Sequence, residues 1–172
     1  MKKLHVGIIG GGSIARRCHV PGYAADADCE LTAIADVNAP SLELMRREFR
    51  FGHEYADFRT MLEREQLDVV SVCTPNKFHA EAAIAALEAG CDVLLEKPVA
   101  MTMAEGEAIR AAVGRSGKRL AVCFSHRFND LVRITRKALD EGRVGAPYMI
   151  RVRFAHNGPQ PGRLLPMLKS AA

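Results

Sequence analysis

Short apolar runs alternate with longer amphipathic segments over the first 124 residues of the chain. The apolar runs are rich in β-branched side chains and do not alternate strictly with polar residues. This pattern is typical of strands that are covered on both faces. The runs predict strands at residues 4–9, 30–36, 53–55 (the weakest candidate), 68–73, 92–96 and 119–124.

Helical periodicity fills the intervals between these strands. Pro21 predicts that the first helix is bent or restarted there, and Gly90 is placed to end the fourth. Thr102 and Glu105 have the spacing of a capping box at the start of the fifth. The predicted helices begin near Ser13, Asn38, Asp57, His79 and Thr102.

Strands and helices that alternate in this way predict an α/β fold with a doubly wound parallel sheet of the Rossmann type. We assign residues 1–124 to this dinucleotide-binding domain. After it the pattern changes to an amphipathic helix over 129–142 and a half-exposed strand over 146–156. The change of pattern indicates that residues 125–172 lie outside the first domain and begin with a helix followed by a strand.

The composition, 48% hydrophobic and 26% charged residues, is that of a globular protein with a core. No apolar run is long enough to cross a bilayer. The basic and apolar start is interrupted by His5 and by glycines, which argues against a signal peptide. The five cysteines lack metal-ligand spacing. We therefore expect a cytoplasmic protein with reduced thiols, no metal site and no membrane partner.

The charge is divided unevenly along the chain. Residues 1–109 carry 11 Lys and Arg against 17 Asp and Glu, a net charge of −6. Residues 110–172 carry 13 against 3, a net charge of +10. Because the basic residues form no clustered tract and are not interleaved with aromatic ones, we do not expect a nucleic-acid partner.

Gly10, Gly12 and Ala15 fit the spacing G-x-G-x-x-G/A between a predicted strand and a predicted helix. Gly10 permits a tight turn, Gly12 presents no Cβ to a pyrophosphate, and Ala15 allows close packing of helix on strand. Ser13 and Ile14 begin the helix, whose N–H groups and dipole favour phosphate. An ordinary strand-to-helix turn is the alternative, but the context favours dinucleotide binding by Gly10, Gly12, Ser13 and Ile14.

Asp36 follows the second predicted strand, where a carboxylate can accept hydrogen bonds from both hydroxyl groups of an adenosine ribose. The alternative is a solvated strand end. The same carboxylate would repel the 2′-phosphate of NADP, so Asp36 predicts NAD as the cofactor and makes NADP the less favoured one.

Thr74, Pro75 and Asn76 follow the strand at 68–73 and therefore lie at the carboxyl edge of the predicted sheet. His79 stands at the start of the next helix. We expect all four to belong to the cofactor site. The alternative for His79 is a surface position at the helix start.

Glu96 and Lys97 end the strand at 92–96, at the same edge of the sheet. Lys97 could donate a hydrogen bond to a substrate hydroxyl or to the nicotinamide, with Glu96 holding its ammonium group in place. An ordinary turn is the alternative. We name Lys97 as the candidate catalytic residue, and Glu96 and Lys97 as candidate cofactor-binding residues.

Four stretches together resemble the Gfo/Idh/MocA family of sugar and cyclitol oxidoreductases, over Lys3 to about His156. The resemblance implies bound NAD(P), with Thr74, Asn76 and His79 lining its site and Lys97 beside the nicotinamide. It also implies that Arg127 and Phe128 lie near a domain junction. The stretches are GIIGGGSIA, TPNKFHAEAAIAALEAG, EKPVAMT and HRFNDLVRITRKALDEGRVGAPYMIRV.

Members of that family are longer and carry a second, substrate-binding domain with an Asp-x-x-x-His motif, which has no match here. The resemblance therefore implies that residues 125–172 are a linker helix and the first strand of an incomplete C-terminal substrate domain of the α+β class. We therefore expect the chain to be the cofactor half of an NAD(P)-dependent dehydrogenase that oxidises a small polyhydroxylated substrate, and the complete protein to be a homo-oligomer. Two alternatives remain open: an NAD-dependent glycosidase of the same family, and a catalytically silent NAD-binding module.

Overall fold

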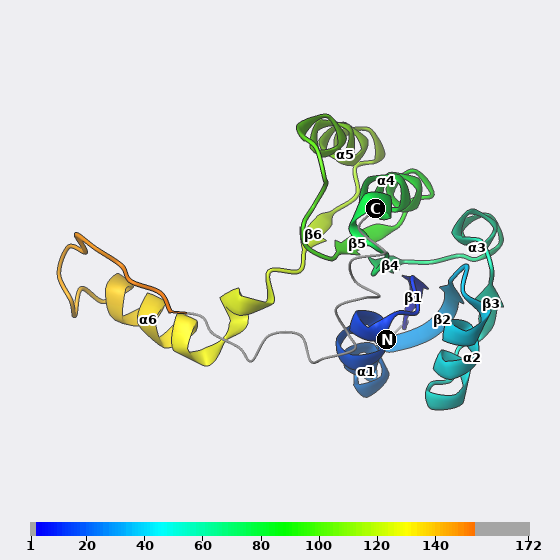
Figure 1. The fold of residues 1–172 in the computed structure, drawn as a ribbon, viewed down its shortest axis with the longest axis horizontal. Helices are drawn as coiled ribbons and strands as arrows, with labels where there is room; N and C mark the ends of the chain where they lie inside the picture. Colours follow the sequence, from blue (N-terminus) through cyan, green and yellow to red (C-terminus); the bar gives the residue numbers. More distant parts are fainter. Residues whose placement is uncertain (1–2, 154–172) are drawn as a thin grey trace, which may run out of the picture. The chain divides into compact units, whose positions relative to one another are not determined.

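The computed structural model describes residues 3–153 (Figure 1). The chain separates into two compact units, with the boundary between Phe124 and Ser125. The first unit contains the sheet, and the described part of the second, residues 125–153, contains a short helical turn and one α-helix. That the second unit begins an α+β substrate domain stays a prediction.

Six strands form one sheet in the order β3-β2-β1-β4-β5-β6, and every neighbouring pair is parallel. The predicted doubly wound parallel sheet is therefore confirmed. The strand order reverses between β1 and β4, which places a crevice at the carboxyl ends of these two strands. The strands are β1 (Leu4–Ile9), β2 (Cys29–Ala35), β3 (His53–Tyr55), β4 (Val69–Val72), β5 (Asp92–Leu95) and β6 (Leu120–Val122).

Helices cover both faces of the sheet, α1 and α2 on one side and α3, α4 and α5 on the other (Figure 1). They are α1 (Val20–Ala25), α2 (Ala39–Glu48), α3 (Phe58–Arg64), α4 (His79–Glu88) and α5 (Met103–Ser116). Short helical turns are η1 (Ala15–His19), η2 (Asn76–Phe78) and η3 (Ser125–Phe128).

Each face of the sheet has its own core, because successive side chains of a strand point to opposite faces. Strand residues Val6, Ile8 and Ile34 pack with Val20 and Met45 beneath α1 and α2. On the other face, strand residues pack with side chains of α3, α4 and α5. This second set includes Ile9, Val70, Val72, Leu95, Met61, Leu87 and Ile109. Burial on both faces explains why the strand sequences lack polar alternation.

The helix ends carry the predicted caps. The Asn38 side chain accepts a hydrogen bond from the Ser41 N–H at 3.1 Å. The Thr102 hydroxyl accepts one from the Glu105 N–H at 3.2 Å, while the Glu105 carboxylate accepts one from the Thr102 N–H at 3.0 Å. Gly90 follows α4 with φ +86°, the left-handed conformation that ends helices.

The helical segment after the glycine turn runs continuously over residues 13–25. Its turn η1 is a π-helix, in which the Val20 N–H donates to the Ala15 carbonyl five residues back. Pro21, which follows at once, has no N–H to donate. The predicted irregularity is therefore present, but it precedes Pro21 as a wider turn and leaves the helix unbroken.

The second unit is described to residue 153. Its helix α6 (Asp130–Asp140) is capped by the Asn129 side chain. Residues 146–153 form no strand, so the strand predicted over 146–156 is wrong for this part, and its last three residues lie outside the described range. A strand needs a second strand to which it is hydrogen-bonded. Between residues 125 and 153 this unit has no other strand that could pair with residues 146–153.

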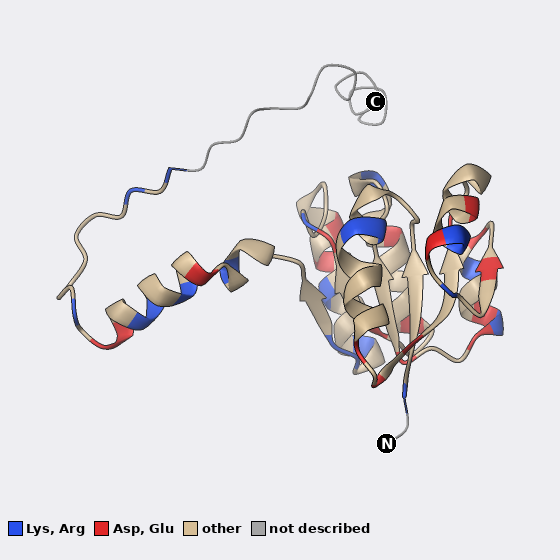
Figure 2. Cartoon of the chain, turned by 90° about the horizontal axis from the view of Figure 1, so that it is seen from below, with Lys and Arg blue, Asp and Glu red and all other residues tan. Residues whose placement is uncertain are grey.

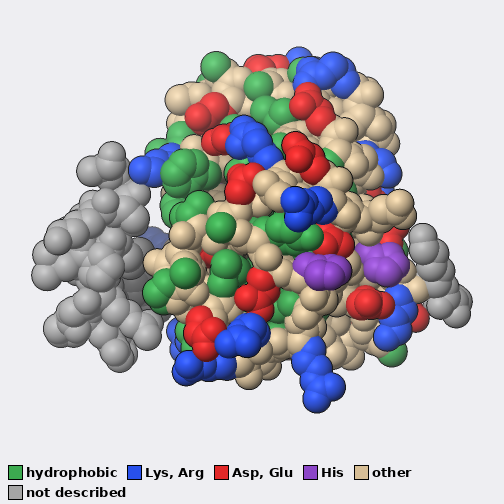
Figure 3. Space-filling model, turned by 90° about the vertical axis from the view of Figure 1, so that its right-hand side faces the viewer, with side chains coloured by type: hydrophobic (Ala, Val, Ile, Leu, Met, Phe, Trp, Pro, Cys, Tyr) green, Lys and Arg blue, Asp and Glu red, His purple; other side chains and the backbone are tan. Residues whose placement is uncertain are grey.

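Acidic and basic residues are interspersed along the helices and loops of the first unit (Figure 2). On the side over α2, β3 and α3 the two signs lie next to each other (Figure 3). Glu43 pairs with Arg46 and Arg47, and Arg59 pairs with Glu81. In residues 3–153 no helix is both long and apolar enough to cross a membrane.

Candidate functional site

A cavity of about 440 Å³ opens at the carboxyl ends of β1, β2 and β4, where the strand order reverses. This is the location that a doubly wound sheet offers to a ligand. The cavity brings together five of the residues predicted from the sequence, namely Gly10, Gly12, Asp36, Thr74 and Pro75.

Gly10 occupies a position that only glycine can fill. Its φ is +96°, and a Cβ there would lie 2.8 Å from the carbonyl carbon and oxygen of Cys73. Both neighbours are backbone atoms and cannot move aside. Gly10 therefore lets the end of β1 pass close to the segment that leaves β4, which shapes the floor of the cavity.

Gly12 differs from Gly10, because a Cβ there would meet nothing within 4 Å. No protein atom thus requires a glycine at this position, and the open space belongs to the cavity. A bare backbone next to open space is what a pyrophosphate needs in order to approach. This observation fits the predicted dinucleotide.

Ser13 and Ile14 are exposed at the start of the helical segment. The first intrahelical hydrogen bond runs from the Arg16 N–H to the Gly12 carbonyl at 3.0 Å. The Ser13 and Ile14 amides therefore precede the hydrogen-bonded turns and remain available to an anion. Neither side chain lines the cavity.

Asp36 supports the glycine turn as well as facing the cavity. Its carboxylate accepts a hydrogen bond from the Gly11 N–H at 2.6 Å and another from the Asn38 N–H at 2.8 Å. A Cβ on Gly11 would lie 3.4 Å from the same carboxylate. The contact between Gly11 and Asp36 was not predicted from the sequence, since nothing in the local pattern pairs residues so far apart.

Thr74 and Pro75 line the cavity, whereas Asn76 is exposed and begins the turn η2. The Thr74 hydroxyl oxygen is buried and has no hydrogen-bond partner within residues 3–153. Since buried hydroxyl groups normally have a hydrogen-bond partner, a bound ligand could provide the partner of the Thr74 hydroxyl.

His79 lies beneath the cavity wall with 1% of its surface exposed. Its Nδ1 lies 2.6 Å from the Pro98 carbonyl oxygen and its Nε2 lies 3.0 Å from the Thr74 carbonyl oxygen. The surface position considered for His79 is therefore wrong. The ring lies between the turn after β4 and the turn after β5, and either neutral tautomer can donate a hydrogen bond to one of the two carbonyls.

Lys97 is exposed at the end of β5, and among the described residues its ammonium group has no ion-pair partner. The sequence led us to expect that the Glu96 carboxylate holds the Lys97 ammonium group, but in the structure the carboxylate has other partners. The Glu96 carboxylate accepts the Lys97 backbone N–H at 3.2 Å and lies 3.0 Å from His19 Nε2. Glu96 thus holds the Lys97 turn through its backbone and leaves the ammonium group unpaired.

Several cavity residues were not predicted. Phe58 and Phe78 form apolar walls, and Ser41 lies in the first turn of α2. Phe78 directly precedes His79 and follows the turn at 74–76, so its position in the sequence could have indicated that it lies at the cavity. Phe58 and Ser41 belong to helices whose approach to the cavity depends on tertiary packing.

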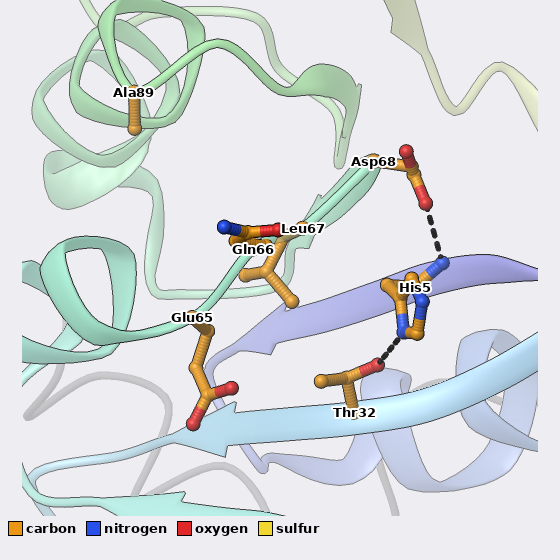
Figure 4. A pocket seen from close by; sticks show the side chains of 7 residues that line it. All are labelled: His5, Thr32, Glu65, Gln66, Leu67, Asp68 and Ala89. Atoms are coloured by element: carbon orange, nitrogen blue, oxygen red, sulfur yellow. Dashed lines mark hydrogen bonds between the residues drawn. The ribbon is translucent and has the colours of Figure 1, made fainter.

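A second cavity, of about 490 Å³, lies at the opposite edge of the sheet (Figure 4). Four of its polar residues, His5, Thr32, Glu65 and Asp68, already have protein partners. Asp68 accepts the His5 N–H at 2.8 Å, and the His5 ring lies 3.2 Å from the Thr32 hydroxyl. Because ligands of doubly wound sheets bind at the carboxyl edge, we assign no cofactor to this cavity.

The Cys73 and Cys123 thiols are poor candidates for nucleophiles. Burial raises the pKa of Cys73, and burial followed by the Glu96 charge raises the pKa of Cys123 to about 11. At neutral pH such thiols are protonated, whereas nucleophilic cysteines are thiolates.

Residues 4–124 match the Gfo/Idh/MocA family, described as an oxidoreductase family with an NAD-binding Rossmann fold. The chain belongs to this family. The family and fold predicted from the sequence are thereby confirmed, and the cofactor of this fold is NAD.

The chain is 35% identical over 159 residues to D-glucoside 3-dehydrogenase of Escherichia coli K12, covering 92% of this chain and 45% of that protein. It is 32% identical over 165 residues to inositol 2-dehydrogenase of Pseudomonas savastanoi pv. phaseolicola, covering 92% and 47%. The structure is similar to scyllo-inositol dehydrogenase of Lactobacillus casei with bound NAD(H) and scyllo-inositol (TM-score 0.79, 25% identity, 84% and 43% covered). The chain thus spans about half the length of its curated relatives.

Proposed function

We propose that this Gfo/Idh/MocA chain binds NAD in the cavity at the carboxyl ends of β1, β2 and β4. We further propose that the chain is the cofactor-binding part of a dehydrogenase, which oxidises a hydroxyl-bearing carbon of a sugar or cyclitol. The observation that carries it is the open space at Gly12, between the start of a helix and the Asp36 carboxylate.

The residues around the cavity divide between the parts of a dinucleotide. Gly12, Ser13 and Ile14 offer a bare backbone and amide groups to the pyrophosphate. Asp36 offers carboxylate oxygens to the ribose hydroxyls. On the opposite side, the turn at 74–76 leads towards the end of β5, where Lys97 lies.

Bound NAD supplies the hydride acceptor for the oxidation. Lys97 presents an unpaired ammonium group that can donate a hydrogen bond to the substrate hydroxyl and lower the cost of removing its proton. Glu96 keeps the turn in place through the Lys97 N–H. His79 joins this turn to the one that holds Thr74. Lys97 is therefore the proposed catalytic residue, and Glu96 and His79 position it.

The relatives' names support a polyhydroxylated substrate, since they act on a glucoside and on inositol. They support the dehydrogenase and not the glycosidase alternative. A cytoplasmic location agrees with five free cysteines. We also propose that the complete enzyme is a homo-oligomer, as the family resemblance implies.

Titration of the isotopically labelled chain with NAD, followed by NMR, tests the site directly. We expect one NAD per chain and shift changes concentrated at residues 10–14, 36–38 and 74–76. Amides of the cavity at the opposite edge, such as those of His5 and Asp68, serve as the internal control and should not move. No saturable binding, or changes centred on His5 and Asp68, would contradict the proposal.

A further inference from the structure

Three different metal-ligating side chains converge behind the Lys97 turn. His19 comes from η1, Glu96 from the end of β5 and Cys123 from the end of β6. His19 Nε2 lies 3.0 Å from Glu96 Oε1 and 3.8 Å from Cys123 Sγ. All three donor atoms lie within 4.8 Å of one another. We propose that His19, Glu96 and Cys123 form a zinc-binding site.

The spacing of the donor atoms suits a tetrahedral ion. Bonds of 2.0–2.3 Å place neighbouring donors of a tetrahedral zinc site roughly 3.3–3.8 Å apart. The distances from His19 Nε2 fall close to this range, so small side-chain rotations suffice. One thiolate, one imidazole and one carboxylate favour zinc over magnesium or calcium, which prefer oxygen ligands alone.

Outer partners hold two of the ligands in orientation. Nδ1 of His19 lies 3.3 Å from the Ser71 hydroxyl, which in turn lies 2.9 Å from the Tyr23 hydroxyl. If Nδ1 donates to Ser71, the Nε2 lone pair points towards Glu96 and Cys123, as metal binding requires. The second Glu96 oxygen accepts the Lys97 N–H. Metal-ligating histidines and carboxylates usually have such partners.

Charge also favours a cation at this position. His19 and Glu96 are buried, with 8% and 9% of their surfaces exposed. In the tautomer that donates to Ser71, the neutral ring cannot compensate the Glu96 carboxylate, which faces the Nε2 lone pair. On binding, zinc would displace the proton of the Cys123 thiol, and its two positive charges would balance the resulting thiolate and the Glu96 carboxylate. Three protein ligands leave the fourth position to water or an external ligand.

The alternative is a cluster in which His19 Nε2–H simply donates to Glu96. Zinc affinity separates the two interpretations without requiring NAD or substrate, so the result is independent of the proposed function. The untagged, reduced chain is titrated with zinc in competition with a chromophoric chelator. We expect one zinc ion per chain, bound at least about tenfold more weakly in Cys123→Ser and in His19→Gln.

Two matched controls should leave the affinity unchanged. Cys29→Ser removes a half-buried thiol outside the cluster. His53→Gln breaks a pair in which His53 Nδ1 lies 2.7 Å from Glu65, a histidine and a carboxylate without a thiol. No zinc binding by the unaltered chain, or equal binding after Cys123→Ser or His19→Gln, would overturn the proposal.

Cobalt provides a measurement that does not depend on the folding of a variant. Co²⁺ replaces zinc in tetrahedral sites, and a thiolate ligand gives it a near-ultraviolet charge-transfer band. We expect this band in the unaltered chain at one equivalent of cobalt, and its removal by an equivalent of zinc. Its absence would show that Cys123 is not a ligand and would overturn the assignment.

Discussion

Gly10 and Gly12 lie in the same turn, but the surroundings of their Cα atoms differ. A Cβ at Gly10 would strike the backbone of Cys73, whereas a Cβ at Gly12 would enter open space. A larger residue at Gly10 would therefore destabilise the fold, whereas a larger residue at Gly12 would impair only the binding of a ligand. This difference makes Gly12 the better position for testing the site.

We predict that Gly12→Val abolishes NAD binding and leaves the protein folded. The branched side chain would occupy the space that the pyrophosphate needs. Calorimetry with NAD measures the loss, and circular dichroism confirms the fold. Gly114→Val is the matched control, because Gly114 also has nothing within 4 Å of its Cβ position but lies in α5, away from the cavity. Normal binding by Gly12→Val would refute the assignment of the glycine turn.

Asp36 predicts the choice between NAD and NADP. Its carboxylate is fixed by the Gly11 and Asn38 N–H groups, so it cannot easily turn away from a 2′-phosphate. Charges about 4 Å apart repel by ~1 kcal/mol in water and ~4 kcal/mol near a protein surface. We therefore expect NAD to bind at least about tenfold more tightly than NADP, a ratio equivalent to ~1.4 kcal/mol.

Calorimetry with NAD and with NADP measures the ratio of the two affinities. We expect Asp36→Asn to lower the preference for NAD. The asparagine keeps an oxygen that can accept one N–H while removing the negative charge. Equal or tighter binding of NADP to the unaltered chain would show that Asp36 does not face the adenosine ribose.

At the scale of elements, α5 follows the Lys97 turn and begins with the capping box of Thr102 and Glu105. We predict that Thr102→Ala lowers the free energy of unfolding by about 1 kcal/mol, because it leaves the Glu105 N–H without its acceptor. Urea denaturation followed by circular dichroism measures the change. Thr102→Ser keeps the hydroxyl and should restore most of the stability. A loss of equal size in both variants would mean that the cap is not the cause.

The Lys97 turn itself is held by histidines from two other elements of the first unit. His19 in η1 lies against Glu96, and His79 at the start of α4 lies against the Pro98 carbonyl. The helix that follows the glycine turn and the turn that carries Lys97 are therefore connected through Glu96. Packing of these elements places the proposed cofactor and catalytic residues at one edge of the sheet.

At the scale of the molecule, we predict that the 172 residues alone bind NAD without sustained turnover. The chain aligns with 45% of the length of D-glucoside 3-dehydrogenase, so much of that protein has no counterpart in it. Orientation of a substrate accounts for ~7–11 kcal/mol of barrier reduction, and a positioned base adds ~10²–10⁴-fold. Lys97 alone cannot replace both contributions.

The assay combines the purified chain with NAD and a panel of inositols, hexoses and sugar acids, and follows NADH absorbance. We expect no steady formation of NADH. Continuous turnover that disappears in Lys97→Ala would show that the first unit carries out the reaction alone, and would refute this prediction.

The sequence alone was sufficient to predict the six strands of the sheet, most helix caps, the doubly wound class and the family. Each depends on short-range information. Apolar runs identify buried strands, Thr102 and Glu105 lie within one turn of a helix, and the spacing of Gly10 and Gly12 describes a single turn. Such patterns act over a few residues and can be recognised before the chain folds.

Tertiary structure decided which distant side chains meet. It turned the Glu96 carboxylate towards His19 instead of the Lys97 ammonium group, buried His79 between two carbonyls, and brought Cys123 to within 3.8 Å of His19. It also left residues 146–153 without a strand partner. Local periodicity encodes whether a residue is buried, but its contacts depend on strand order and helix packing, which bring together residues separated by as many as 104 positions.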